Sequence, residues 1–163
     1  MSLYPEWGIF GAWGIETGSI IVHLLPQFDE IVNDNLTKDT FEDFSNALEA
    51  AISHELVHGP QFQKIIAKGS LQKIADEYDR KKDNPKEYRA ISIEIMAFAQ
   101  QSFKEFLRAG YSTQDILEFL RKPSTVSPDD SYIFCEYLEL FGANHKIFKQ
   151  FSNYIYQYCM NKK

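Results

Sequence analysis

The sequence predicts an α+β fold that is mostly α, in which a small N-terminal β-hairpin packs on a bundle of helices. Two patterns lead to this fold class. Aromatic and β-branched residues gather between glycines at 7–24, and apolar residues recur at three- and four-residue intervals after Thr37. With 163 residues, 44% of them hydrophobic, the chain suits a single domain over 1–163. We expect a hairpin region at 1–36, helices with the candidate site at 37–109, and further helices at 110–163.

Charge and composition disfavour several classes of function. The net charge of −6 and the pI near 5.2 argue against a nucleic-acid or anionic-membrane surface, since either needs a clustered basic face. No charged start precedes an apolar segment, and no apolar run approaches the roughly 20 residues that span a bilayer. We therefore expect a cytoplasmic protein. Cys135 and Cys159 lie far apart, which does not indicate a disulfide scaffold.

The N-terminal region has the pattern of two strands. One segment covers residues 7–15, and a compact second segment covers residues 20–24 before Pro26. The residues between them, at 16–19, are typical of a turn. In the second segment, His23 is expected to be a packed or rim side chain.

A first amphipathic helix is expected from a cap at Asp39 or Thr40. Its apolar stripe consists of Phe41, Phe44, Leu48, Ala51 and Ile52. Proline removes an N–H and disfavours helical geometry in the residue before it, so Pro60 should end or kink this helix just after His58. Two shorter helices should follow, at 60–68 and at 70–81.

A core helix is expected from Asn84 to about Ala109, with proline after the Asn84 cap and Gly110 as its stop. Its middle, residues 90–99, is apolar on nearly every face. Glu94 is the only charged residue between positions 90 and 103. Three further helices should begin at Ser112 or Thr113, at residues 127–130, and at Asn144.

The most informative motif is His54-Glu55-Leu56-Val57-His58. On a helix, the two histidines lie about 40° apart around the axis and about one turn apart along it, so both can reach one metal ion. Glu55 is rotated about 100° from His54, where it can hold a water molecule on the metal and act as a general base. The apolar stripe continues into Glu55 and His58. Burying these groups would be costly unless something such as a metal ion satisfies them.

A catalytic zinc site needs a third protein ligand and an open position for water. Glu94 is the best candidate, because a carboxylate in an apolar run needs a partner. Glu87 is the second candidate, followed by Asp76 or Glu77. An extended motif with a third histidine is absent, because Gln61 and Lys64 occupy its last two fixed positions.

With these residues the chain resembles the zincin metallopeptidases, and among them gluzincin-like proteins with a ligand glutamate on a later helix. The segment Glu94-Ile95-Met96-Ala97-Phe98-Ala99 is similar to the E-x-x-A-x-A segment of small phage-associated zincins and ImmA/IrrE-type proteases. The resemblance covers residues 10–108 and implies a minimal zincin-like fold. Phe98 departs from better-known gluzincins, which have an acidic residue there, and the orienting partners of both histidines are not identified.

Together, the motif and the resemblance lead us to expect a zinc-dependent peptidase that binds one Zn²⁺ through His54, His58 and Glu94. Glu55 would take a proton from the metal-bound water that attacks the peptide carbonyl. The resemblance implies that a peptide or protein substrate lies along the second strand, at Ile20, Ile21, Val22 and His23. A hydrogen-bond donor to the oxyanion is also expected, with Tyr88 ranked before Tyr78, His23 and His145.

Two alternatives remain open from the sequence. In the first, the metal is a structural clip in a non-catalytic protein-binding module, closed by a fourth ligand such as His145 or Asp79. In the second, the protein is a regulatory protease of the ImmA/IrrE kind that cleaves one specific protein such as a repressor. Digestion of casein or a peptide library would distinguish this protease from a general one.

Overall fold

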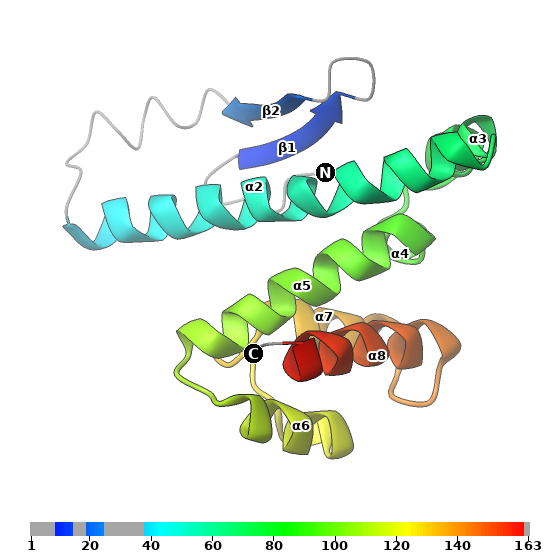
Figure 1. Ribbon diagram of the computed structural model, residues 1–163. Helices are drawn as coiled ribbons and strands as arrows, with labels where there is room; N and C mark the ends of the chain where they lie inside the picture. The colour runs from blue at the N-terminus through cyan, green and yellow to red at the C-terminus, as the bar shows by residue number, and fades with distance from the viewer. Residues whose placement is uncertain (1–8, 15–18, 25–37, 162–163) are drawn as a thin grey trace. The chain divides into compact units, whose positions relative to one another are not determined.

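The computed structural model describes residues 9–14, 19–24 and 38–161, which are drawn as helices, strands and their connections in Figure 1. The chain divides into two compact units, an N-terminal unit (Met1–Ala75) and a C-terminal unit (Asp76–Lys163). The single domain expected over 1–163 stays a prediction.

The N-terminal unit contains two strands and one long helix. Strands β1 (Ile9–Gly14) and β2 (Ser19–Leu24) pair antiparallel, with Ile9 opposite Leu24 and Gly14 opposite Ser19. Helix α2 (Lys38–Ala67) packs mainly against β1, which lies between β2 and the helix (Figure 1). The expected turn lies largely outside the described residues, which resume at Ser19.

The predicted α+β fold class is wrong, although its mostly helical character agrees with the structure. In the described residues, β1 and β2 form one two-stranded ladder, and every other element is helical. Within the N-terminal unit, the ladder packs on α2. The described part of the chain is therefore a mainly α protein. Two short strands do not form a layer of the fold, so the strand signal at 7–24 does not determine the fold class.

Helix α2 does not end at Gly59. It continues through Pro60 to Ala67, so an end after His58 and a separate helix at 60–68 are both wrong, whereas a kink at Pro60 stays a prediction. Proline deprives the carbonyl of residue 56 of its helical partner. Leu56 is 55% exposed and Pro60 is also exposed, so this carbonyl lies on the side of the helix where water can hydrate it.

Gly69 ends α2 with a positive φ of 62°. The Gly69 N–H donates to the Ile66 carbonyl at 2.9 Å and the Ser70 N–H donates to the Ile65 carbonyl at 3.0 Å, which is a Schellman motif. Helix α3 (Leu71–Lys81) follows directly, as expected from Ser70.

The C-terminal unit is a helical bundle around α5 (Ser92–Arg108), which packs mainly against α8 (Lys146–Asn161) and α7 (Tyr132–Phe141). Helix α6 (Thr113–Arg121) and the short 3₁₀ helix η1 (Pro123–Thr125) connect α5 to α7. Among the described residues, the five largest fully buried side chains are all aromatic: Phe98, Phe106, Phe134, Tyr137 and Phe151. The rings of Tyr137 and Phe151 stack with centroids 4.0 Å apart.

The helix expected at 84–109 is broken in two, which corrects the prediction of one continuous helix. Helix α4 (Pro85–Arg89) is capped by Asn84 as expected, and α5 begins after Ile91, whose backbone is extended (φ −67°, ψ 130°). The Arg89 carbonyl at the break accepts a hydrogen bond from the Tyr137 hydroxyl at 2.8 Å, and Ile91 is fully buried. Tertiary contacts thus compensate for the lost helical hydrogen bonds.

Caps set the remaining boundaries. Ser112 caps α6 in a capping box with Asp115, and Gly110 has the left-handed geometry expected of a helix stop. Helix α7 starts later than predicted, because Ser127 forms a turn with Asp130 and Ser131 becomes the N-cap.

Helix α8 is preceded by His145 and not by the expected Asn144 as its cap. A ring nitrogen of His145 accepts a hydrogen bond from the backbone N–H of Ile147 at 3.2 Å. Among the described residues, no helix is long and apolar enough to cross a membrane.

Candidate metal centre

One face of α2 is buried, and the histidine motif lies on it. His54, Glu55 and His58 are only 2%, 5% and 4% exposed, and Ala47 and Ala51 continue the same face towards the start of the helix. The expected inward direction of the motif agrees with this burial. The predicted stripe was misplaced at its start, because Phe41 is 52% exposed. Small alanines, and not aromatic rings, form the buried part next to the motif.

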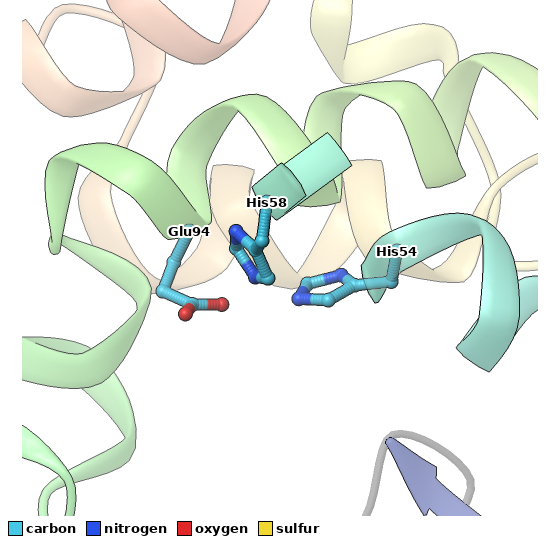
Figure 2. A group of neighbouring side chains, drawn as sticks. All are labelled: His54, His58 and Glu94. Atoms are coloured by element: carbon cyan, nitrogen blue, oxygen red, sulfur yellow. The ribbon is translucent and has the colours of Figure 1, made fainter. Parts of the chain in front are cut away.

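The two imidazoles lie side by side on successive turns of α2. Their ring centroids are 5.0 Å apart and their planes are nearly perpendicular, at 81°. Figure 2 shows both rings extending from α2, and it shows Glu94 on α5. The local spacing of the motif therefore produces the paired arrangement that the sequence predicts.

Gln61 supplies a partner for His58 that the sequence analysis did not find. The distance from His58 Nδ1 to Gln61 Oε1 is 2.8 Å. A carbonyl oxygen can only accept, so this contact is a hydrogen bond in the tautomer that carries its proton on Nδ1, and that tautomer has a lone pair on Nε2. Ligand histidines in metal sites commonly donate their other ring N–H in this way. The two residues are three positions apart on one helix, which is the signal that could have found this contact.

The third candidate ligand, Glu94, lies in the first turn of α5 and is 3% exposed. Tyr88 on α4 donates its hydroxyl hydrogen bond to Glu94 Oε2 at 2.9 Å. The C-terminal unit therefore holds a buried carboxylate in place with a tyrosine from the neighbouring helix.

Tyr88 is itself enclosed by aromatic rings. Its ring meets those of Tyr78 and Phe98 edge-on, with centroids 5.8 Å and 6.1 Å away. Burial raises the pKa of Tyr88 well above its usual range, and the nearby charge of Glu94 raises it further. The Tyr88 hydroxyl therefore keeps its proton, which it donates in the hydrogen bond to Glu94. The role of Tyr88 as a donor to an oxyanion stays a prediction.

The other candidate ligands lie at the surface of the C-terminal unit. Glu77 pairs with Lys81 at 2.6 Å and Asp79 pairs with Lys82 at 3.0 Å. The remaining candidates, Asp76, Glu87 and His145, are exposed. The His145 ring stacks on Phe141, with centroids 5.4 Å apart, and accepts the Ile147 N–H at the start of α8. Tyr78, a candidate oxyanion donor, is 39% exposed.

The predicted substrate-binding residues, Ile20, Ile21, Val22 and His23, lie in β2 and pair with Trp13, Ala12, Gly11 and Phe10 of β1. Ile21 is 49% exposed. The side chains of the other three lie outside the described part of the structure, so the use of His23 in the site stays a prediction.

Comparisons of the chain with protein-family models, with curated proteins and with solved structures find no match. Two imidazoles and one carboxylate are a donor set found in catalytic zinc sites. All three residues are buried, whereas clusters of exposed acidic groups are common without a bound ion.

Proposed function

We propose that this chain is a zinc-dependent metallopeptidase in which His54, His58 and Glu94 hold one Zn²⁺ and Glu55 is the general base. Each of the three ligand residues is buried and offers one ligand atom to a group that could hold a metal ion (Figure 2). In this proposal, α2 supplies the two histidines and α5 supplies the carboxylate.

The observation that carries the proposal is the contact between the His58 ring and the Gln61 side chain. His58 Nδ1 is bound to Gln61 Oε1 at 2.8 Å while the ring is 4% exposed. This arrangement leaves Nε2, the usual metal-binding atom, without the proton that would block coordination.

The donor set favours a catalytic centre over a structural one. Catalytic zinc sites use three protein ligands and leave a position for water, whereas structural sites are closed by four. In the described part of the chain, the candidate group has three members. His145 and Asp79, the fourth ligands considered for a closed site, are engaged at α8 and with Lys82.

When bound, zinc would lower the pKa of a coordinated water molecule and polarise the carbonyl of the peptide bond. The chain itself supplies the proton transfer. Glu55 follows His54 directly, so its carboxylate is turned about 100° away from that ligand and lies beside the metal site. From there it accepts the proton of the attacking water and returns it to the nitrogen of the departing amine.

Zinc content and cleavage of casein or of a peptide library by the purified protein test this proposal. We expect one zinc per chain and measurable cleavage. Glu55→Gln should keep the zinc and lose about 10²- to 10⁴-fold in rate. Glu42→Gln is a matched control on the same helix, because Glu42 is exposed and pairs with Lys38. A chain that binds no zinc, or a Glu55→Gln variant that cleaves as fast as the parent, would contradict the proposal.

A further inference from the structure

The contact between Tyr88 and Glu94 exists because the helix is broken between them. In a continuous α-helix, residues six positions apart are turned about 240° from each other and are separated by about 9 Å along the axis. The two side chains would then be on different faces. In the structure, α4 ends at Arg89 and α5 begins at Ser92, and the Tyr88 hydroxyl lies 2.9 Å from Glu94 Oε2.

Several buried contacts hold this break in place. The Tyr137 hydroxyl binds the Arg89 carbonyl at 2.8 Å. The Arg89 guanidinium lies over the ring of Phe98, 3.7 Å from its centroid, and pairs with Glu136 at 2.6 Å. Helix α4 is therefore anchored to α5 and α7 through Arg89, the residue next to Tyr88. This anchoring limits how far the tyrosine can move relative to Glu94.

We infer that Tyr88 is a positioning residue for the metal: it holds Glu94 through Oε2 so that Oε1 is presented to the ion. The inference rests on the proposed function, since it assigns a role in the same metal site. A carboxylate with one oxygen fixed by a neutral donor has fewer orientations to lose when the other oxygen binds a cation. Tyr88 thus acts on affinity and geometry at the metal without touching the substrate.

The test compares zinc binding by the parent, by Tyr88→Phe and by a control, each measured by competition with a chromophoric chelator. Phenylalanine keeps the ring that packs against Phe98 and removes only the hydroxyl. Tyr132→Phe is the control, because Tyr132 is 61% exposed on α7. We expect Tyr88→Phe to bind zinc about 10- to 100-fold more weakly, and the control to stay within about twofold of the parent.

A second readout distinguishes positioning from a general loss of structure. In a Glu94→Gln background, Tyr88→Phe should weaken zinc binding by less than about threefold further, because its effect passes through the carboxylate. The visible spectrum of the cobalt-substituted protein should change for Tyr88→Phe and not for Tyr132→Phe. If Tyr88→Phe does not fold, Tyr88→Met replaces it, since methionine adapts to irregular spaces and lacks the donor.

The possible results separate the inference from the proposed function. A parent that binds no zinc refutes the proposed function. A parent that binds zinc, together with a Tyr88→Phe or Tyr88→Met variant of parental zinc affinity and cobalt spectrum, refutes only the role of Tyr88. A full effect that persists in the Glu94→Gln background also refutes that role.

Discussion

Replacing Gln61 by leucine should weaken metal binding by removing the hydrogen bond that orients His58. Leucine has a similar size, so the change mainly removes the carbonyl oxygen 2.8 Å from His58 Nδ1. The effect depends on the state of the site. In metal-free Gln61→Leu, the His58 imidazole can move its proton to the other ring nitrogen or rotate, because the acceptor at Nδ1 is gone. With Nε2 bound to a metal, Nδ1 must carry the proton and needs an acceptor.

The magnitude follows from the burial of His58, which is 4% exposed. A buried donor left without its acceptor costs about 1–3 kcal/mol, and about 1.4 kcal/mol corresponds to tenfold in affinity. Loss of an orienting partner of a metal ligand typically costs 10–100-fold in affinity. Both estimates predict that Gln61→Leu raises the zinc Kd by about 10- to 100-fold.

The assay is zinc titration of Gln61→Leu with a competing chelator, combined with ¹⁵N NMR of the histidine rings. Gln63→Leu is a matched control, because Gln63 is exposed two residues later on α2. The parent should show the Nδ1-protonated tautomer at His58, and Gln61→Leu should show a mixture before metal is added. Unchanged zinc affinity and an unchanged tautomer in Gln61→Leu would refute the reasoning.

Two further predictions concern the C-terminal bundle. Tyr137→Phe leaves the buried Arg89 carbonyl without its donor, so urea unfolding should show a loss of about 1–3 kcal/mol; the exposed Tyr156→Phe should change stability by less than about 0.5 kcal/mol. Burial raises the pKa of Glu105, against the opposing effect of its hydrogen bond from Ser131. The folded state therefore favours the protonated carboxyl of Glu105. Its contribution to the free energy of unfolding is fully present below the pKa of Glu105 in the unfolded chain, and it is lost as the pH rises through the higher pKa of Glu105 in the folded chain. Glu105→Gln, which can keep the acceptor, should reduce this loss; an identical pH dependence of unfolding in variant and parent would show that Glu105 does not cause it.

Local signals in the sequence predicted much of the helical part. Asn84 and Ser112 act as caps, and Gly110 stops α5, because each provides a hydrogen bond or backbone geometry that depends on few neighbours. The start of α7 was harder to predict. Ser127 and Ser131 are both plausible caps in the sequence. The Ser127 N–H donates a hydrogen bond to the Asp130 side chain, so Ser127 belongs to a turn and Ser131 caps the helix.

The candidate ligands were predictable for a different reason. The spacing of His54 and His58 encodes their common face on any helix, and the isolation of Glu94 in an apolar segment implies burial. Their partners were not predictable from the same signals. Gln61 looks like an ordinary polar residue after a proline, and Tyr88 looks like a core aromatic residue ahead of Glu94.

Both partners depend on the two places where the local rules predict the backbone incorrectly. Pro60 was expected to end or kink α2, and an end there would have removed the helical spacing that brings Gln61 to His58. The apolar segment at 90–99 should have stayed helical, and a continuous helix would have kept Tyr88 away from Glu94. In the first case an exposed carbonyl tolerates the proline, and in the second the Tyr137 hydroxyl compensates for the break. Departures from local preference that tertiary contacts support are typical of functional sites, and here each departure brings a hydrogen-bond partner to a proposed metal ligand.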